Sequence, residues 1–465
     1  MPNSRENLLP AVDPAYCKGC ARCIDACLHN CIEMGNEINP LTGLTPVILH
    51  LEDCTHCGLC VTACPEPYGL HMDSITDDYS AVRPETFDGV VKTRPKAASI
   101  PSTKIPINPG KPILIKGTYA SSIGAVLAGC RHFYGYPITP STEGAELMAK
   151  LLPNLDGIFI QAVSEVAAIN MLYGTGGAGL PCMTFTSSPG FSLMLEGISY
   201  MIGSEVPSVI VNIMRGGPGL GNIAPEQSDL KLVCHGLGHG NTQCVVLAPA
   251  TPQEMLDLTM LAFELTFKYR NPVIIIGDGY LGQITGKVSL PDYMIQPGLP
   301  DWAVYGDAGH RGNLIASIDI TEPDLEARNI RLNHKYDTMI KAEQRSDSFF
   351  CEDAEILLVA MNTPAQMAKG AVQQLRSEGI KVGLFRPITA WPFPVDALSK
   401  LIPQIRQIVV VEASNGQLED EIRLSLSKAG VTQLPPISFV RRFGGILPQT
   451  HEIVEKIHAL EGVVA

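Results

Sequence analysis

Two runs of four cysteines near the start of the chain constrain its fold more than any other feature. The runs are "CKGCARCIDAC" (17–27) and "CTHCGLCVTACP" (54–65), and both space their cysteines two, two and three residues apart. Nine of the 14 cysteines fall between Cys17 and Cys64. In a reducing compartment such clustering indicates bound metal more often than disulfides. The N-terminal region is therefore expected to fold around metal.

The spacing is that of two-cluster ferredoxins, where three cysteines of one run and the last cysteine of the other bind each [4Fe-4S] cluster. The predicted ligands are, for the first cluster, Cys17, Cys20, Cys23 and Cys64, and for the second, Cys54, Cys57, Cys60 and Cys27. Residues 32–38 and 44–51, between the runs, are expected to form short strands. Zinc is the alternative, because paired cysteines also build ribbon sites. Two complete runs favour iron and sulfur.

The first run departs from the usual motif in two places. Leu28 stands where proline usually follows the fourth cysteine, and a fifth cysteine, Cys31, lies four residues beyond Cys27. Cys31 is an alternative ligand of the second cluster. The motif spacing favours Cys27 as the ligand and Cys31 as a buried thiol.

Charge and hydropathy exclude several classes of partner. The net charge of -13 argues against a nucleic-acid partner, since binding to phosphates depends on Lys and Arg. No apolar run approaches the ~18 residues of a membrane span, so no membrane partner is expected. The first 14 residues lack the features of a secretory signal. These observations predict a cytoplasmic protein.

The chain of 465 residues is long enough for several domains. A segment with six prolines, residues 83–112, is expected to be an extended tether between a ferredoxin-type domain (1–82) and the rest. From 113 to 290, apolar strand-like runs alternate with helical patterns, which predicts a doubly wound α/β domain with a parallel sheet. Residues 291–353 look irregular apart from a charged helical pattern over 322–344. A second, smaller α/β domain is expected over 354–465.

Three reactive side chains follow predicted strands, where ligands bind in open α/β sheets. Thr139 precedes Pro140, which predicts a helix N-cap beside unpaired amides, a place suited to a small anion. Glu165 opens the next predicted helix. Arg215 follows "SVIVNIM" and precedes "GGPGLG". A helix cap, a first-turn acid and a loop charge are sufficient structural explanations for each residue taken singly, but together they predict a site for a small carboxylate.

Other motifs carry less weight. The "GDG" at 277–279 has no Asn at the offset expected of a magnesium and diphosphate motif, so it is interpreted as a turn. Gly219, Gly221 and Ala224 match a dinucleotide-binding pattern, but Pro225 follows at once, which favours an ordinary loop. His235 and His239 lack nearby ligands at metal spacing and are expected in a loop. The remaining cysteines are expected to be packed thiols: Cys130, Cys182, Cys234, Cys244 and Cys351.

From about residue 112 onward the sequence resembles the alpha subunits of 2-oxoacid:ferredoxin oxidoreductases. The resemblance rests on five motifs in order: "GYPITPSTE" (135–143), "SEVAA" (164–168), "TFTSSPG" (184–190), "MRGGPGLGNIAPEQSD" (214–229) and "FRPITAWPFP" (385–394). It implies a pyrimidine-type thiamine-diphosphate domain followed by a domain like the C-terminal domain of transketolase. The cysteine runs then form a fused domain that conducts electrons.

The resemblance also implies residue roles. Thr139 would touch the bound 2-oxoacid beside the cofactor, and Arg215 would hold the substrate carboxylate or its neighbourhood. Glu165 would hydrogen-bond the aminopyrimidine ring of thiamine diphosphate and promote deprotonation of the thiazolium carbon. A beta subunit would bind the diphosphate through Mg²⁺, and a gamma-type subunit would complete the coenzyme A chemistry. The cofactor supplies the carbanion chemistry in such enzymes.

The reaction implied is oxidative decarboxylation of a 2-oxoacid to acyl-CoA and carbon dioxide, with electrons passing through the clusters to an external ferredoxin. The motif at 214–229 favours 3-methyl-2-oxobutanoate as the substrate, and 2-oxoglutarate and pyruvate are the alternatives. A rival hypothesis is a non-catalytic electron-transfer or scaffold subunit. The presence of Thr139, Glu165 and Arg215 argues against that rival.

Overall fold

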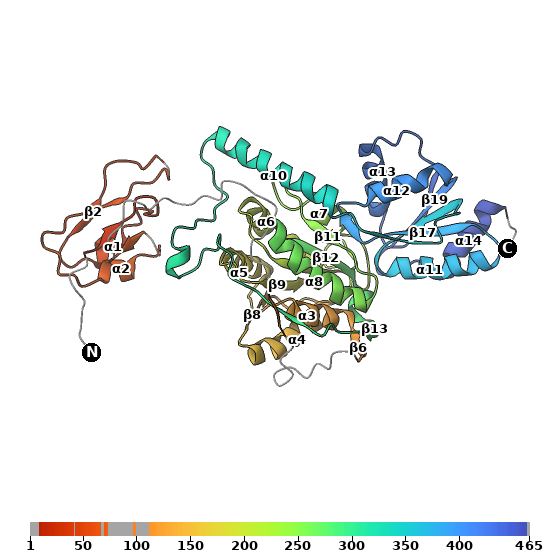
Figure 1. Cartoon of the computed structure of the whole chain (residues 1–465), viewed down its shortest axis with the longest axis horizontal. Helices are drawn as coiled ribbons and strands as arrows, with labels where there is room; N and C mark the ends of the chain where they lie inside the picture. The colour runs from red at the N-terminus through yellow and green to blue at the C-terminus, as the bar shows by residue number, and fades with distance from the viewer. Residues whose placement is uncertain (1–8, 41, 67–68, 73–95, 99–110, 463–465) are drawn as a thin grey trace. The chain divides into compact units, whose positions relative to one another are not determined.

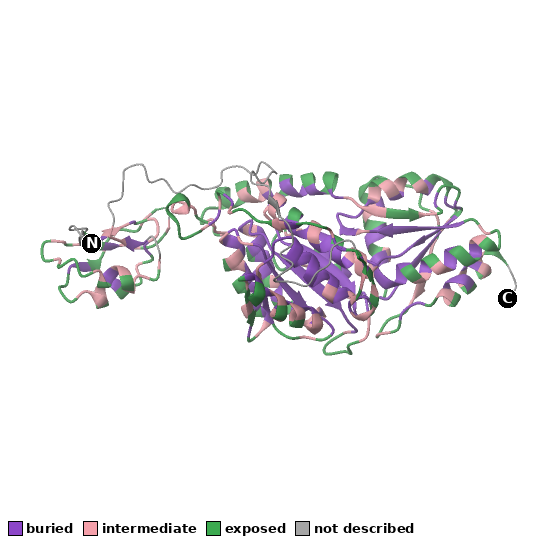
Figure 2. Ribbon diagram, turned by 60° about the horizontal axis from the view of Figure 1, so that its bottom comes forward, coloured by how far each residue is buried: buried purple, intermediate pink, exposed green. Residues whose placement is uncertain are grey.

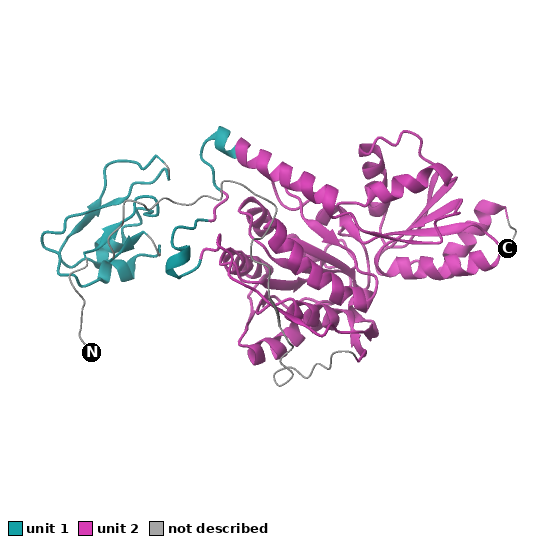
Figure 3. Cartoon of the chain, in the orientation of Figure 1, with its two compact units in different colours: residues 1–83, 305–314, 318–325 teal, residues 84–304, 315–317, 326–465 magenta. Residues whose placement is uncertain are grey.

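The computed structural model describes residues 9–40, 42–66, 69–72, 96–98 and 111–462. The chain divides into two compact units (Figure 3). The smaller unit contains residues 1–83, 305–314 and 318–325, and the larger contains 84–304, 315–317 and 326–465. None of the helices formed by the described residues is both long and apolar enough to span a membrane.

Within its described residues up to 72, the smaller unit contains two short antiparallel strand pairs and two helices of five residues. The expected pair of strands between the cysteine runs is confirmed, with Ile32 opposite Leu49. A further antiparallel pair joins residues near the two ends of this unit. The strands are β1 (Ala11–Val12), β2 (Ile32–Met34), β3 (Val47–Leu49) and β4 (Leu70–His71), and the helices are α1 (Arg22–Ala26) and α2 (Leu59–Ala63).

The larger unit contains a seven-stranded sheet in the order β18-β11-β12-β10-β9-β7-β8. Six strands run parallel, as the alternating pattern predicts, and β18 is antiparallel. The strands are β7 (His132–Gly135), β8 (Ile158–Gln161), β9 (Cys182–Thr186), β10 (Val209–Met214), β11 (Val245–Leu247), β12 (Val273–Asp278) and β18 (Thr389–Trp391).

Every residue of the central strands β9, β10 and β12 is buried, which shows that both faces of this sheet are covered, and helices provide the cover (Figure 2). Two groups of helices pack among themselves: α3 with α4 and α8, and α5 with α6. Right-handed crossovers place these groups on opposite faces. The helices are α3 (Gly117–Leu127), α4 (Thr142–Leu151), α5 (Glu165–Gly177), α6 (Ser188–Gly203), α7 (Leu230–His235), α8 (Pro252–Tyr269) and α9 (Gly279–Gln283).

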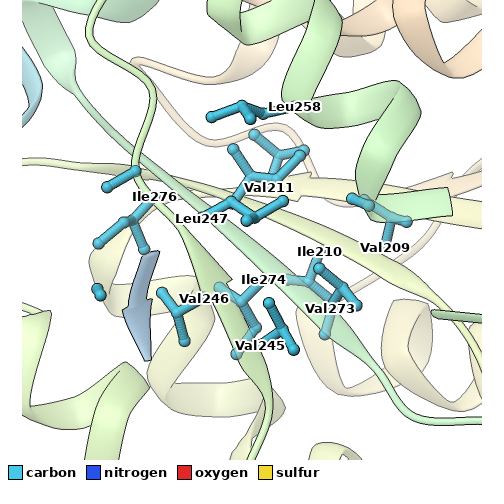
Figure 4. Packing of buried hydrophobic residues seen from close by; sticks show 14 of the residues in the cluster. Val209, Ile210, Val211, Val245, Val246, Leu247, Leu258, Val273, Ile274 and Ile276 are labelled. Atoms are coloured by element: carbon cyan, nitrogen blue, oxygen red, sulfur yellow. The ribbon is translucent and has the colours of Figure 1, made fainter. Parts of the chain in front are cut away.

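The core of this sheet is made of β-branched and leucine side chains from neighbouring strands. Figure 4 shows Val211 with Leu258 of α8 on one face of the sheet, and Val246 with Ile274 on the other. Such runs are apolar throughout because both faces of a parallel sheet are covered.

A second sheet of five strands lies in the same unit, in the order β15-β17-β16-β19-β20. All four strands expected after residue 354 are confirmed. The strands are β15 (Ser346–Phe349), β16 (Ile356–Val359), β17 (Val382–Pro387), β19 (Gln407–Glu412) and β20 (Ile437–Arg441), and the helices are α11 (Asn362–Ser377), α12 (Val395–Leu401), α13 (Gln417–Lys428) and α14 (Thr450–Glu461).

The segment expected to be irregular, 291–353, holds more structure than its sequence indicates. The long charged helix is present as α10 (Glu322–Ala342), which Figure 1 labels. In the same segment, β14 (Met294–Gln296) pairs with β5 (Lys96–Ala98), and β15 joins the second sheet. Most of the expected proline-rich tether lies outside the described residues. The division of the chain at 83, 113, 291 and 354 remains a prediction.

Smaller elements complete the fold. An antiparallel pair joins a strand that precedes α3 in the chain to a strand that follows α9, with Thr285 opposite Lys116. These elements are β6 (Ile113–Lys116), β13 (Thr285–Val288) and the 3-10 turns η1 (Leu152–Leu155), η2 (Ala308–His310) and η3 (Ile402–Gln404).

Candidate functional site

Thr139 lies beyond β7, but it does not cap a helix, so that expectation is wrong. Helix α4 begins at Thr142, with Ser141 at its N-cap. Residues 138–141 form a turn instead, because the Ser141 amide and hydroxyl both donate to the Ile138 carbonyl, at 3.0 and 2.7 Å. The Thr139 side chain is exposed, and the peptide bond to Pro140 is cis.

Glu165 is the first residue of α5, as predicted, and its side chain is buried at 4% exposure. The N-cap is its neighbour Ser164, whose hydroxyl accepts a hydrogen bond from the Ala167 amide at 3.2 Å. The carboxylate of Glu165 is therefore not needed as a cap. No described residue donates a hydrogen bond to it. A buried carboxylate without a donor is costly, so it is more consistent with a ligand than with a structural role.

Beside Glu165 is a cradle that a single methyl group would fill. The position of a Cβ on Gly190 lies 2.4 Å from both Glu165 Oε1 and Thr186 Oγ1. The Thr186 and Ser187 hydroxyls are buried and have no partner among the described residues. A carboxylate and two free hydroxyls suit a flat, polar ring with donors and acceptors, such as an aminopyrimidine. The residues therefore fit the pyrimidine end of thiamine diphosphate.

Arg215 follows β10 and is buried at 8% exposure, so it is not a solvated loop charge. Its Nη1 donates to the Thr139 carbonyl at 2.7 Å, and its Nη2 donates to the Leu220 carbonyl at 3.3 Å. Its Nε is buried without a partner among the described residues. The structure thus brings Arg215 to the backbone of Thr139 and leaves the Nε donor of the guanidinium for a ligand.

A buried acid, Asp229, stabilises this edge of the sheet through hydrogen bonds. It accepts hydrogen bonds from the Ser188 hydroxyl at 2.6 Å and from the Asn212 amide at 2.9 Å. Burial raises the pKa of Asp229, and these donors oppose the rise. Ser188 Oγ in turn accepts from the Arg215 amide at 3.1 Å. Asp229 therefore helps to fix the backbone from which the Arg215 side chain extends.

Sequence reasoning named no role for these supporting residues. Asn212 lies within the fully buried strand β10, Thr186 ends the buried strand β9, and Ser187 and Ser188 follow it directly. A polar residue in a buried strand usually serves a hydrogen-bonded network. That signal was available within "VIVNIM" and "TFTSSPG".

The "GDG" at 277–279 has a structural role. Asp278 is fully buried and is the N-cap of α9, where its Oδ1 accepts from the Tyr280 and Leu281 amides at 3.0 and 2.9 Å. Its carboxylate also accepts from the amide and the hydroxyl of Thr363, at 2.9 and 2.8 Å. Burial raises the pKa of Asp278. The "GDG" therefore joins the end of β12 to the start of α9 rather than forming a turn, and the oxygens of Asp278 are used within the chain.

The cysteine runs form two groups in the smaller unit. Cys23 and Cys60 are buried in α1 and α2, and each of these helices ends at the fourth cysteine of its run, Cys27 or Cys64. Burial raises the pKa of Cys23 to about 11, and three neighbouring thiols add to that rise: Cys17, Cys64 and Cys20. Burial also raises the pKa of Cys60, with added effects from Cys27, Cys54 and Cys57. The neighbours of Cys23 and of Cys60 are the cysteines that the sequence assigns to their respective clusters, and the ligand sets stay a prediction.

A hollow lined by the second group supports its role as a cluster site. Its walls include Cys27, Cys54, Cys57 and Cys60, and also Cys31. Among the described residues, no three His, Cys, Asp or Glu side chains are arranged to hold a single metal ion. Thiols set around a hollow fit a cuboidal cluster, whose irons are separate.

Cys31 is buried and lies against Cys27. Its amide donates to Cys27 Sγ at 3.3 Å, and its own thiol donates to the His29 carbonyl at 3.6 Å. An amide hydrogen bond to sulfur is the kind of contact that stabilises a ligating thiolate. The geometry therefore favours Cys27 as the ligand, as the motif spacing does.

The remaining candidates serve packing. His235 is the last residue of α7 rather than a loop residue, and its Nε2 lies 2.6 Å from Glu421 Oε2. His239 lies in a loop and packs edge-on against Tyr200. The five scattered cysteines are all buried and free, as expected: Cys130, Cys182, Cys234, Cys244 and Cys351.

Three protein families match successive parts of the chain. Residues 16–67 match a 4Fe-4S dicluster domain. Residues 123–345 match the thiamine-diphosphate-binding domain of pyruvate flavodoxin/ferredoxin oxidoreductase, and residues 354–453 match core domain II of pyruvate:ferredoxin oxidoreductase. These matches support two [4Fe-4S] clusters and thiamine diphosphate as the cofactors.

Curated relatives and a solved structure agree with these families. Ketoisovalerate oxidoreductase subunit VorB of Methanothermobacter thermautotrophicus is 43% identical over 75% of this chain and 98% of its own length. The 2-oxoglutarate synthase subunit KorA of Methanocaldococcus jannaschii is 35% identical over 73% and 97%. The 2-oxoglutarate:ferredoxin oxidoreductase from Magnetococcus marinus, solved with 2-oxoglutarate, coenzyme A and succinyl-CoA bound, superposes with a TM-score of 0.68 at 27% identity, over 75% of this chain and 65% of that one. With its cysteine runs and its strand-end site, the chain therefore belongs to the family of 2-oxoacid:ferredoxin oxidoreductase subunits.

Proposed function

We propose that this chain carries the pyrimidine half of the active site and the electron exit of a CoA-dependent 2-oxoacid:ferredoxin oxidoreductase. The observation that carries the proposal is the buried carboxylate of Glu165, which accepts no hydrogen bond from a described residue and lies beside the cradle at Gly190. In the overall reaction, a 2-oxoacid and coenzyme A give acyl-CoA, carbon dioxide and a proton, and two electrons reduce two ferredoxins. Thiamine diphosphate, when bound, supplies the carbanion chemistry.

Each site residue has a distinct task in this proposal. Glu165 would hydrogen-bond the aminopyrimidine ring of the cofactor, and its side chain is buried at 4% exposure. Arg215 offers its buried Nε to the carboxylate of the 2-oxoacid. Thr139 contributes its exposed side chain to the substrate side and its carbonyl to the orientation of Arg215. Fixed donors of this kind gain most in a site that excludes water.

The cysteines complete the electron path. Cys17, Cys20, Cys23 and Cys64 bind one [4Fe-4S] cluster in this proposal, and Cys27, Cys54, Cys57 and Cys60 bind the other. Each cluster passes one electron at a time, and an external ferredoxin accepts them. The clustered free thiols support a reducing, cytoplasmic setting.

A second chain must provide the diphosphate half. The one "GDG" sequence of this chain has its carboxylate occupied by four hydrogen bonds, so it has no free oxygen for Mg²⁺. We therefore propose a beta subunit that binds the diphosphate through Mg²⁺, and a gamma-type subunit for coenzyme A. The relatives are themselves named as subunits, which supports this arrangement.

The substrate we propose is 3-methyl-2-oxobutanoate. The relative named for ketoisovalerate is 43% identical, compared with 35% for one named for 2-oxoglutarate. The branched apolar tail of 3-methyl-2-oxobutanoate distinguishes it from both alternatives, 2-oxoglutarate and pyruvate. A panel of the three acids, assayed with coenzyme A and a viologen acceptor, distinguishes them by kcat/KM.

The deciding experiment replaces Glu165 in the assembled complex. Glu165→Gln keeps the shape of the side chain and removes its charge, so turnover should fall by at least about a hundredfold. The visible and EPR spectra of the clusters should stay normal. Unchanged turnover would favour the non-catalytic scaffold instead. The isolated chain should show both clusters but no decarboxylation until the beta subunit is added.

A further inference from the structure

The strand order of the second sheet creates a crevice of the kind in which open α/β sheets bind ligands. From β16 the chain passes to β17 on one side, and it then crosses to β19 on the other, so the strand order reverses between β16 and β19. In open α/β sheets, the crevice beyond the carboxyl ends of two such strands is where ligands bind. Met361 and Ala413 lie just past these ends, and both are buried.

That crevice is filled by a side chain of the same chain, Gln227. The Gln227 amide group donates from Nε2 to the Met361 carbonyl at 3.0 Å and to Asn362 Oδ1 at 3.1 Å. Its Oε1 accepts from the Ala413 amide at 2.8 Å, and its backbone amide donates to the Ala413 carbonyl at 2.7 Å. Gln227 is only 2% exposed. Both hydrogens and the oxygen of its side chain are therefore used.

The orientation of this amide is fixed by its surroundings. Asn362 donates from Nδ2 to the carbonyls of Pro249 and Ile276, at 2.9 and 2.8 Å. Its Oδ1 must therefore face Gln227, where it and the Met361 carbonyl both require a donor. A glutamate at 227 would place an acceptor against two acceptors.

Gln227 lies on the returning arm of the loop that carries Arg215. Arg215 pairs with Pro225 in an isolated antiparallel bridge, and the Gly216 amide donates to the Ala224 carbonyl at 2.9 Å. From the other side, Gln417 donates from Nε2 to the Ser228 carbonyl at 2.6 Å. The second sheet and its helix α13 therefore bind residues 227 and 228, which continue the strand segment that pairs with Arg215.

We propose that Gln227 is a positioning residue: by occupying the crevice of the second sheet, it fixes the loop 215–229 so that the Arg215 guanidinium faces the substrate carboxylate. The inference rests on the role of Arg215 in the proposed function. It gives the C-terminal sheet a task in substrate binding without any contact to the substrate. If Gln227 only held the two sheets together, replacing it would lower stability and would leave substrate affinity unchanged.

The test compares Gln227→Ala and Gln227→Glu with Gln417→Ala and with a control, Gln374→Ala, in the reconstituted complex. Gln374 is exposed, and among the described residues its side chain donates only to Glu378, the C-cap of its own helix, so its loss should change nothing. Both Gln227 variants should raise KM for the 2-oxoacid about tenfold, with a smaller change in kcat and normal cluster spectra. Gln417→Ala loosens the same arm from the other side and should raise KM less.

Hydrogen exchange provides a readout that does not depend on activity. In Gln227→Ala the Ala413 amide loses its acceptor, so peptides over 412–416 and 216–229 should exchange faster than in the unmodified chain. Unchanged exchange would overturn the proposal. Faster exchange with an unchanged KM would also overturn it, provided that Arg215→Lys raises KM. If Arg215→Lys leaves KM unchanged, the role given to Arg215 is wrong, and the positioning role is lost with it.

Discussion

The guanidinium of Arg386 in β17 donates to both carboxylate oxygens of Glu254 in α8, at 2.9 and 2.7 Å. The same carboxylate accepts from the Ala250 amide at 2.8 Å, at the start of α8 where Thr251 is the N-cap. One side chain therefore completes a helix start beside the first sheet and also binds a strand of the second. Two-pronged pairs of this kind are among the stronger hydrogen-bonded contacts in proteins.

Replacing Arg386 should loosen this connection. Arg386→Met leaves Glu254 partly buried without its partner, so the free energy of unfolding should fall by about 2 kcal/mol. The matched control is Lys381→Met, which removes an exposed partner of Glu355 and should have no measurable effect. Thermal unfolding followed by circular dichroism measures both. Equal midpoints for the two variants would contradict the prediction.

A single methyl group in the cradle beside Glu165 should block the cofactor. In Gly190→Ala the new Cβ would lie 2.4 Å from Glu165 Oε1 and Thr186 Oγ1, so one of them must move. We expect thiamine diphosphate to bind about 10- to 100-fold more weakly to the complex. Gly174→Ala is the control, because nothing lies within 4 Å of its Cβ position in α5. Titration calorimetry distinguishes them, and equal affinities would show that the cradle is not the pyrimidine site.

The two cysteines at the end of the first run should have different effects. Cys27→Ala should remove the second [4Fe-4S] cluster, because it takes away a ligand. Cys31→Ala should keep both clusters, since it preserves the amide that donates to Cys27 Sγ. Iron analysis and EPR of the reduced chain measure the outcome. Loss of a cluster in Cys31→Ala, with both retained in Cys27→Ala, would assign the ligand to Cys31.

A buried lysine should make the stability of the larger unit depend on pH. Lys335 is fully buried, and burial lowers its pKa to about 8, although Glu205 at 3.2 Å opposes the shift. Between pH ~8 and the ordinary lysine pKa of about 10.4, the unfolded chain binds this proton and the folded chain does not. The contribution of Lys335 to stability should therefore rise with pH across that window.

Comparison with Lys335→Met isolates this contribution, because all other groups titrate alike in both proteins. Glu205 keeps a partner in the variant, since Arg331 Nη2 lies 2.9 Å from its Oε2. Urea unfolding at several pH values between 8 and 10 should show the difference between the two proteins growing in favour of the unmodified chain. Parallel curves would mean that Lys335 titrates normally.

Local sequence patterns predicted the strands and supplied the candidate residues of the proposed site. Continuous apolar runs such as "VIVNIM" can be buried on both faces only in a covered parallel sheet, so both sheets followed from alternation. Glu165 and Arg215 became candidates because side chains that follow parallel strands share one edge of the sheet, and both prove to be buried at strand ends. The cysteine groups followed from spacing alone.

Long-range pairing could not be predicted in the same way. Thr139 looked like a helix cap because Thr-Pro is a common helix start, yet a tight turn to Ile138 takes the place of that start. The motif "FRPITAWPFP" contributes β17 to one sheet and β18 to the other, with only Ile388 between them. Gln227 gave no signal either, because its partners lie 134 or more residues away along the chain.

The antiparallel strand β18 also bears on when the first sheet can finish folding during synthesis. Its backbone covers β11, with Val246 opposite Trp391, although the ribosome synthesises β11 well over a hundred residues earlier. Until residues 389–391 emerge, β11 has an open edge, and such edges invite pairing with other chains. The first sheet therefore finishes folding only after most of the second has been synthesised, and β18 is the last part of its edge to be closed.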